Sequence, residues 1–234
     1  MKNKNILGHL QIVVSSSLFG LMPLITKMAY SYGATPITVA FCRCFYATII
    51  LAVILPFMRK NIFSIERKQI VPMLKIAIPF GLIPVTLFIA YTYLDSGMAT
   101  ILFYTHPIFV MVLSILMYHI FPSKKQILCM ILCLAGIVLL NAIQGKIKVV
   151  GIAVAILAGF IYSVYVIACD QKGIDEIDPT VLSFWINLFA SIAVGIIGIA
   201  TGQLMIVTEP MGQLSMFVLA LLVSVIAVLL FQHG

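Results

Sequence analysis

Charge is scarce in this sequence. Charged residues make up 9% of the 234 residues and hydrophobic residues 63%, whereas a soluble domain carries roughly 25% charged residues. So few charges could not cover the surface of so apolar a core, which excludes a soluble enzyme and a disordered chain. The net charge of +7 therefore does not indicate a nucleic-acid partner, and the lipid bilayer is the expected surrounding.

Acidic residues are absent from the interior of the long apolar stretches, although the chain holds seven of them. Carboxylates inside a membrane form proton relays and cation sites, so their absence argues against proton-driven export of lipophilic cations. The sequence has no G-x-x-x-x-G-K-[ST] motif, no metal-ligand cluster and no nucleophile–base pair. It therefore predicts no ATPase, no cofactor, no metal and no enzyme activity. The five cysteines are odd in number, and we interpret them as small buried hydrophobes: Cys42, Cys44, Cys129, Cys133 and Cys169.

Eight apolar blocks run along the chain between polar breaks. Each is close to the ~20 residues that a membrane-spanning helix needs, and none alternates as a barrel strand would. The sequence therefore predicts an all-α membrane protein, a multi-pass bundle of eight transmembrane helices. The blocks are residues 10–30, 37–58, 70–91, 97–118, 126–144, 149–169, 180–201 and 213–232.

The basic residues predict the orientation of these helices. Cytoplasmic loops of membrane proteins are enriched in Lys and Arg. Placing the N-terminus in the cytoplasm puts nine basic residues inside and only Lys146 and Lys148 outside. We therefore expect a protein of the cell membrane with its N-terminus in the cytoplasm. The nine are Lys2, Lys4, Arg59, Lys60, Arg67, Lys68, Lys124, Lys125 and Lys172.

An internal repeat emerges when the sequence is shifted against itself so that Pro36 falls on Pro179. This repeat shift also places Phe41 on Phe184, with no gap from the first helix through the third. Since the first helix starts inside and the sixth outside, the repeat is inverted, as in many secondary transporters. We expect two units, residues 1–144 with five helices and residues 145–234 with three.

The repeat shift places Tyr91 on Gly234, so the second unit has no counterpart of the fourth and fifth helices. The expectation is an incomplete inverted five-helix repeat: a truncated product, a partial sequence, or a protein that completes itself by pairing. The pairing partner would be a second copy, forming a homodimer, or a full-length paralogue.

The motifs resemble those of EamA-domain permeases in the drug/metabolite transporter superfamily. The stretch SSLFGLMPLITKMAYSYGATPITVAFCRCFYATIILAVIL is similar to the first two helices of that family. The segments around Pro107 and the AGIVL ending of the fifth helix are similar to later helices, and VGIAVAILAGFIYSVYVI resembles the sixth. The resemblance implies two five-helix repeats and a transport function, and it carries no information on the substrate.

Three functions remain in view. The leading hypothesis is a carrier of a small polar metabolite, such as an amino acid, by secondary transport or facilitated efflux with alternating access. The alternative is a non-transporting remnant, or an accessory membrane subunit of a full-length paralogue. An intramembrane enzyme is the third, and it lacks a catalytic constellation. The length of the reading frame after Gly234 would separate the first two.

Arg43 is the charge that most needs an explanation, because a charge at the bilayer centre costs about 2.5–3.5 kcal/mol on insertion scales. It lies seven residues after Pro36 in the second block. Two interpretations stay open: snorkelling to the outer headgroups, or a place in the bundle interior as a clamp or an anion contact. We expect Lys27 and Lys75 to lie at membrane interfaces.

Tyr104, Thr105, His106 and Pro107 form a polar interruption in the fourth block. Pro107 removes an N–H and frees the carbonyl of Phe103, which then needs another partner. A broken, polar helix centre lines cavities in many transporters. We expect Tyr104 and His106 on a cavity wall between the first, third, fourth, sixth and eighth helices; the alternative is a packing kink.

Aromatic and amide side chains complete the candidate substrate site. Phe19, Tyr91 and Tyr162 could line a solute route or belong to interface belts, and Asn187 needs a partner inside the seventh block. Ser16 and Gly20 form a small-xxx-small pair that we interpret as helix packing. The candidate substrate-binding residues are Phe19, Arg43, Tyr91, Tyr104, His106, Tyr162 and Asn187.

Overall fold

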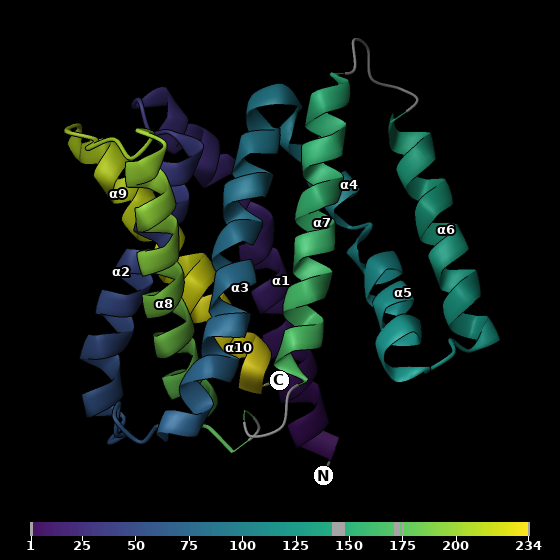
Figure 1. Ribbon diagram of the computed structural model, residues 1–234, viewed down its shortest axis with the longest axis horizontal. Helices are drawn as coiled ribbons and strands as arrows, with labels where there is room; N and C mark the ends of the chain where they lie inside the picture. Colours follow the sequence, from purple (N-terminus) through teal and green to yellow (C-terminus); the bar gives the residue numbers. More distant parts are fainter. Residues whose placement is uncertain (1, 142–147, 171–173, 175, 234) are drawn as a thin grey trace.

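The structure is a computed structural model that describes residues 2–141, 148–170, 174 and 176–233. Its described residues fold into helices only, joined by short connections (Figure 1). One helical segment, η1, is a π-helix. The elements are α1 (Lys2–Ser31), α2 (Pro36–Phe57), α3 (Arg67–Tyr93), α4 (Ser96–Phe103), α5 (His106–Tyr118), α6 (Lys124–Asn141), α7 (Val149–Cys169), α8 (Pro179–Ala200), α9 (Pro210–Leu219), η1 (Ala220–Ile226) and α10 (Ala227–His233).

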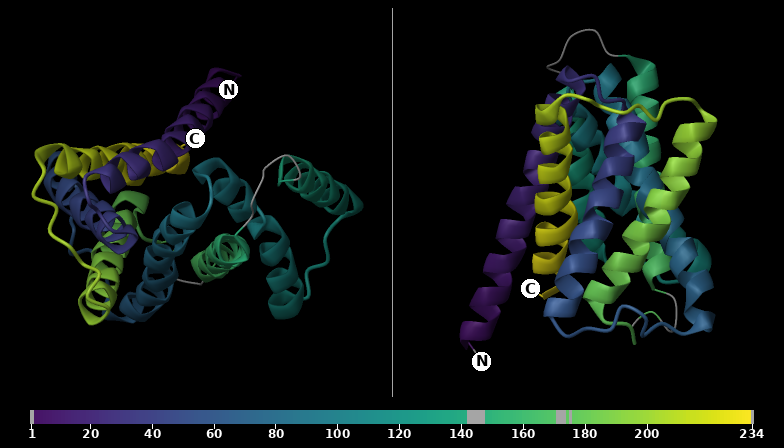
Figure 2. Two further views of the ribbon diagram at one scale, coloured as in Figure 1. Left: turned by 90° about the horizontal axis from the view of Figure 1, so that it is seen from above. Right: turned by 90° about the vertical axis from the view of Figure 1, so that its left-hand side faces the viewer.

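This architecture confirms the predicted all-α, multi-pass membrane fold. Within the described residues, seven helical stretches are long and apolar enough to cross a membrane, with α4–α5 counted as one and α9 to Leu230 as another. The remaining predicted block, residues 126–144, corresponds to α6, and its last three residues lie outside the described part. The chain starts and ends at the same end of the bundle (Figures 1 and 2).

The ends of α2 and α8 are formed by the same local chemistry. Each helix begins with a proline after an N-cap whose side chain accepts backbone N–H groups: Thr35 for α2 and Asp178 for α8. Each helix is followed, two residues after its last, by a residue with positive φ, Arg59 or Gly202. Proline suits the first helical turn, and a left-handed residue ends a helix.

Helices of the first part of the chain pack mainly against helices of the second part. α3 packs along α7 and α8, α2 packs along α8 and η1, and α1 packs along α9 and α10. α4 and α5 pack chiefly against α7, and α6 meets the bundle chiefly at α4. Figure 2 shows α6 standing at the edge of the bundle, apart from α1 and α10.

Two hydrophobic clusters are stacked along the bundle axis. The first contains Ala40 of α2, Val194 of α8 and Val223 of η1. The second contains Ala47 of α2, Ile186 of α8 and Val225 of η1. On each of these helices the two clusters are separated by a few residues, so a thin layer divides the core at mid-height. Buried polar residues lie between the two clusters on these helices: Arg43 on α2, Ser191 on α8 and Ser224 on η1. Ser163 lies likewise on α7, between Ala158 of the first cluster and Ala168 of the second.

The small-residue pair on α1 does not have the role that we predicted for it. Ser16 is exposed and its hydroxyl donates to the carbonyl of Ile12 one turn back. A Cβ added at Gly20 would meet nothing within 4 Å. The prediction of packing at Ser16 and Gly20 is therefore wrong within the described chain. Glycines do serve close packing in α8, where a Cβ at Gly198 would lie 3.0 Å from Ile37.

Candidate functional site

Arg43 lies inside the bundle, so the snorkelling interpretation is wrong. The residue is 7% exposed, and its position on α2 falls between the two hydrophobic clusters. Its Nε donates a 2.7 Å hydrogen bond to Ser224 Oγ of η1. The guanidinium carbon lies 5.6 Å from the ring centre of Phe80 in α3, within the range of a cation–π interaction. Arg43 thus links three helices at mid-height.

The partner helix of Arg43 is irregular at the point of contact. Ser224 belongs to η1, and π-helical turns inside α-helices are rare and frequent at functional sites. α3, on the other side of Arg43, holds Pro79 and Pro84, each of which removes a backbone hydrogen bond. Gly81 lies between them, where a Cβ would be 3.2 Å from Ala190 of α8. The two helices that contact Arg43, η1 and α3, therefore both depart from regular α-helical hydrogen bonding near it.

The fourth predicted helix is interrupted between α4 and α5, as the sequence indicated. α4 ends at Phe103 and α5 begins at His106. The freed carbonyl of Phe103 lies 3.1 Å from Nδ1 of His106, which can donate to it in one tautomer. Gly159 of α7 makes room for this break: a Cβ there would lie 2.9 Å from the Phe103 oxygen and 3.1 Å from Thr105 Oγ1.

A continuous series of aromatic contacts joins this interruption to Arg43. The ring of His106 lies 4.4 Å from that of Tyr162, and Tyr162 lies 5.8 Å from Tyr165 one turn along α7. Tyr165 in turn lies 5.6 Å from Phe80, whose ring faces the guanidinium of Arg43. Tyr104 is also in ring contact with His106, at 5.9 Å, and is 55% exposed. The predicted residues Arg43, Tyr104, His106 and Tyr162 are thus connected.

Tyr91 and Phe19 lie against the first hydrophobic cluster. Tyr91 is 4% exposed, and its hydroxyl lies 3.1 Å from Thr100 Oγ1 of α4. Phe19 is partly buried and packs against the same cluster. No hydrogen bond or ring contact of the described chain joins either of them to the aromatic series.

Asn187 is buried in α8, and half of its amide is satisfied. Its Nδ2 donates to the carbonyl of Ser183, at 2.8 Å, whereas Oδ1 has no hydrogen-bond partner in the described chain. A second buried oxygen without a partner among the described residues is Thr26 Oγ1 of α1. An acceptor such as Asn187 Oδ1 can take an N–H or O–H donor from a solute.

Three residues of the site were not predicted from the sequence: Phe80, Tyr165 and Ser224. Tyr165 stands three residues after Tyr162, so helical spacing could have found it. Phe80 and Ser224 carry no local signal, because their importance comes from meeting Arg43 across the bundle. Ser224 is 181 residues away from Arg43 in the sequence.

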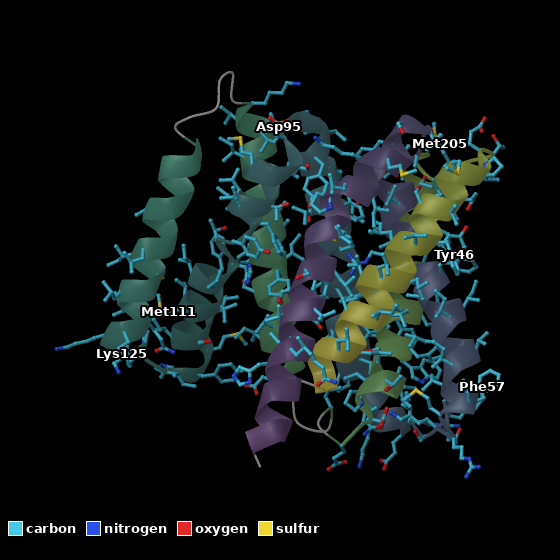
Figure 3. The ribbon with its side chains drawn as sticks, turned by 180° about the vertical axis from the view of Figure 1, so that it is seen from behind. Tyr46, Phe57, Asp95, Met111, Lys125 and Met205 are labelled. Atoms are coloured by element: carbon cyan, nitrogen blue, oxygen red, sulfur yellow. The ribbon has the colours of Figure 1, made fainter. Side chains whose placement is uncertain are left out.

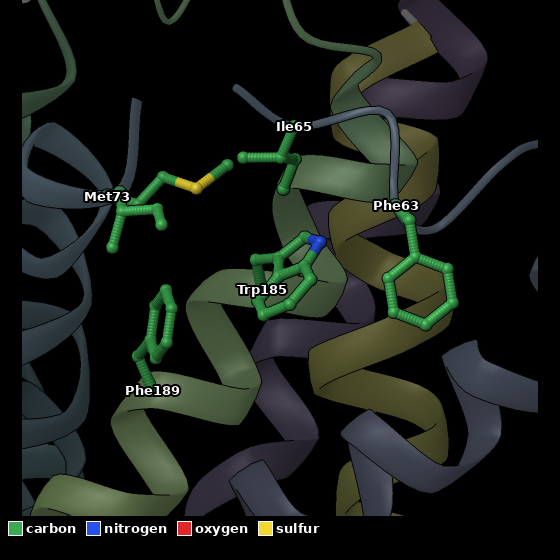
Figure 4. Close-up of a pocket in the computed structure, with 6 residues that line it drawn as sticks. Phe63, Ile65, Met73, Trp185 and Phe189 are labelled. Carbon is green, nitrogen blue, oxygen red and sulfur yellow. The ribbon is translucent and has the colours of Figure 1, made fainter. Parts of the chain in front are cut away.

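An apolar pocket of the described chain lies at a different place. Trp185 and Phe189 of α8 and Met73 of α3 form its walls, together with Phe63 and Ile65 of the α2–α3 connection (Figure 4). Trp185 Nε1 donates to the carbonyl of Ile62, at 2.9 Å. The pocket has an apolar lining and lies at the end of the bundle where α8 begins. It holds none of the predicted site residues.

Opposite charges meet beside this pocket, at the end of α2. Lys60 Nζ donates to Asp178 at 2.8 Å and to Thr180 Oγ1 at 3.0 Å. Partial burial of the Asp178 carboxyl acts to raise its pKa, but the hydrogen bonds from Lys60 and from the N–H groups of Thr180 and Val181 outweigh it. The pKa of Asp178 therefore lies below its ordinary value.

Charged residues lie at both ends of the bundle. Lys125 and Phe57 lie at the end of the bundle where the chain starts (Figure 3). Asp95 and Met205 lie at the opposite end. Lys27 lies near the Asp95 end, 4.0 Å from that carboxylate and half-exposed. This position agrees with the predicted interfacial role of Lys27. Lys75 is exposed.

The cysteines whose side chains the structure describes are free. Cys44 is buried, and Cys42 and Cys169 are partly buried. This agrees with the interpretation of these three as small hydrophobes of the bundle. The side chains of Cys129 and Cys133 lie outside the described residues.

Comparison with known proteins identifies one family. The profile of the EamA-like transporter family matches residues 6–142, which is more than half of the chain and spans α1 to the end of α6. Neither the curated proteins nor the solved structures include a match.

Proposed function

The chain belongs to the EamA-like transporter family, and on that premise we propose that it carries a small polar metabolite, such as an amino acid, across the cell membrane by alternating access. The observation that carries the proposal is the polar layer at mid-height, with Arg43 at its centre and the aromatic series leading from it to the α4–α5 interruption. Buried polar groups at membrane depth are costly and mark solute pathways.

Alternating access needs helices that can bend near the site, and two candidates flank Arg43. Pro79 and Pro84 weaken α3, and the π-turn of η1 weakens the last membrane span. Helix bends occur at prolines and π-turns. We propose that α3 and the α9–η1–α10 span bend at these points, while α2 and α8, which are joined to one another at both ends, move as one body.

The inverted repeat is part of the same proposal. We propose that residues 1–144 and 145–234 are two units related by a pseudo-two-fold axis in the membrane plane. The support is that α3 packs on α7 as α9 and α10 pack on α1, and that α3 packs on α8 as η1 packs on α2. The repeat shift exchanges the members of each of these pairs.

The test of transport is solute uptake into proteoliposomes that hold the purified chain. We expect uptake of at least one labelled amino acid above protein-free vesicles. His106→Ala and Tyr162→Ala should lower uptake about tenfold or more, since both rings form the route to Arg43. Tyr118→Ala, an exposed tyrosine at the end of α5, is the matched control and should transport normally. Equal uptake by all variants would contradict the proposed route.

A second function stays in view: an accessory membrane subunit of a full-length paralogue, or a remnant that does not transport. What favours it is the sparse packing at one edge of the bundle, because α5 has no buried residue. The paralogue reconstituted with and without this chain would separate the two. Uptake by the chain alone supports the carrier, and uptake by the paralogue that rises when this chain is present supports the subunit.

A further inference from the structure

Arg43 brings a positive charge to the middle of the bundle without a fixed negative partner. The ion pairs of the described chain lie at the ends of the helices: Lys27 with Asp95, Lys60 with Asp178, and Lys68 with Glu66. None of the ion pairs among the described residues involves Arg43. A charge that is costly at this depth is therefore left without the compensation that an acid would give.

The guanidinium also keeps most of its hydrogen-bonding capacity. Arg has five N–H donors in a planar fork, and the hydrogen bond of Arg43 in the described chain uses only Nε, toward Ser224 Oγ. The two terminal nitrogens carry the four remaining donors. Their geometry matches the two oxygens of a carboxylate, which Arg binds in a bidentate fashion.

The surroundings of Arg43 orient that fork. Ser224 Oγ accepts from Nε at one edge of the guanidinium, and the guanidinium carbon lies over the ring of Phe80. Tyr165 packs against Phe80, so aromatic carbon continues from Arg43 toward Tyr162 and His106. A solute with a carboxylate at one end and a small apolar or aromatic body would place the first on Arg43 and the second along these rings.

We propose that Arg43 binds the carboxylate of the transported solute, and that Ser224 holds the guanidinium in position for it. This inference rests on the proposed carrier function and names its substrate class: a monoanionic or zwitterionic carboxylate. A single negative charge neutralises the single charge of Arg43 at mid-height. A cationic solute would meet repulsion there, since the described layer holds no acid.

The competing role for Arg43 is structural, as a clamp that ties α2 to η1 through Ser224. The two roles differ in what Ser224 does. A clamp loses its function when Ser224→Ala removes the acceptor. A carboxylate site loses only the positioning by Ser224 in that variant and still binds, because the terminal nitrogens and the charge of Arg43 remain.

Ligand-dependent thermal stability of the purified protein in detergent tests the inference without requiring transport. The probes are acetate, propionate and benzoate, with acetamide, propionamide and benzamide as neutral isosteres and tetramethylammonium as the cation, at constant ionic strength. We expect the carboxylates to raise the unfolding temperature and the amides and the cation to leave it unchanged. Carboxylates that act no better than their amides would overturn the inference.

Three variants assign the effect to Arg43. Arg43→Gln should abolish the carboxylate shift. Arg43→Lys keeps the charge but not the fork, and should weaken the apparent affinity about tenfold. Ser224→Ala removes the positioning contact and should weaken the apparent affinity about threefold, less than Arg43→Lys does, without abolishing the shift. If Arg43→Gln does not fold, the other two variants decide. A carboxylate affinity equal to that of the wild type in Arg43→Lys would contradict the inference, and so would complete loss of the carboxylate shift in Ser224→Ala.

Failure of this inference can be separated from failure of the carrier function. Carboxylate binding that needs Arg43, without uptake into proteoliposomes, would retain the site and reject transport by the chain alone. Uptake of a neutral or cationic solute that Arg43→Gln leaves intact would retain the carrier and reject the carboxylate site.

Discussion

Arg59 and Gly202 occupy equivalent positions under the repeat shift and share a left-handed backbone, with φ angles of 55° and 65°. The backbone bonds around them match as well. Arg59 N–H donates to the carbonyl of Pro56 and Gly202 N–H to that of Ile199, which is the equivalent of Pro56. Lys60 and Gln203 continue the same pattern. The helix ends thus agree bond for bond with the shift seen in the sequence, which supports the proposed inverted repeat.

The shared conformation leads to a prediction about two substitutions. A left-handed backbone costs a non-glycine residue roughly 1–2 kcal/mol, and a Cβ at Gly202 would meet nothing within 4 Å. Gly202→Ala should therefore lower the free energy of unfolding by about 1 kcal/mol through the backbone alone. Arg59→Gly should leave stability nearly unchanged, because relief of strain offsets the added chain entropy. Unfolding in mixed micelles measures both.

The α2–α8 pair is joined at its two ends by contacts at equivalent positions. At one end, Lys60 donates to Asp178, the N-cap of α8. At the other, Thr35, the N-cap of α2, donates to the carbonyl of Gln203, at 2.6 Å. The repeat shift relates Lys60 to Gln203 and Thr35 to Asp178. One end therefore carries an ion pair where the other has a neutral contact.

This difference predicts that only one end responds to acid. Because the pKa of Asp178 is lower in the folded chain, its stabilisation is present above its ordinary pKa of about 3.9 and is lost as the pH falls through the lower, folded value. Unfolding temperatures at pH 6 and pH 3 should differ less in Asp178→Asn than in the wild type, since Asn also caps helices.

A lysine substitution gives the matched control for this ion pair. Lys60→Ala should cost up to about 1 kcal/mol, because the pair is partly exposed. Lys68→Ala should cost nearly nothing, since Lys68 and Glu66 are both well exposed. Equal losses in the two variants would show that Lys60 does not join α2 to α8.

The sequence predicted the membrane helices well because length and apolar content alone decide whether a segment can span a bilayer. The interruption near Pro107 was also predictable, since a proline has no N–H to donate to the helix carbonyl four residues before it. The break falls at that carbonyl, Phe103. The partner of the carbonyl, His106 Nδ1, is local, and its proximity follows from the break itself.

The sequence could not predict what depends on distant packing. No proline or glycine marks η1, so its π-turn and the meeting of Ser224 with Arg43 had no local signal. The prediction that Ser16 and Gly20 pack against another helix failed for a related reason. Small residues permit close approach of a helix, but they do not say where that helix comes from, and α1 presents Gly20 to the outside.

The distribution of basic residues predicts the orientation in the membrane. Lys125 and Phe57, which shortly precedes Arg59, lie at the end where the chain starts, and Asp95 lies at the other (Figure 3). Reporter fusions after Arg59 and Lys125 should report the cytoplasm, and fusions near Asp95 and Glu209 should report the exterior. A reporter pattern of the opposite sense would reverse the proposed orientation and leave the fold unchanged.

Gly159 is the residue on which the α4–α5 interruption rests. A Cβ there would press on the Phe103 oxygen at 2.9 Å, and neither that backbone atom nor α7 can yield without moving the break. Gly159→Ala should therefore destabilise the chain by about 1–3 kcal/mol, the usual cost of overpacking. It should also shift His106 away from Tyr162 and lower solute uptake. Gly20→Ala is the control: nothing obstructs a Cβ there, and alanine favours a helix by up to about 1 kcal/mol. Its stability should equal or exceed that of the wild type, and a Gly159→Ala variant as stable as Gly20→Ala would mean that α7 does not support the break.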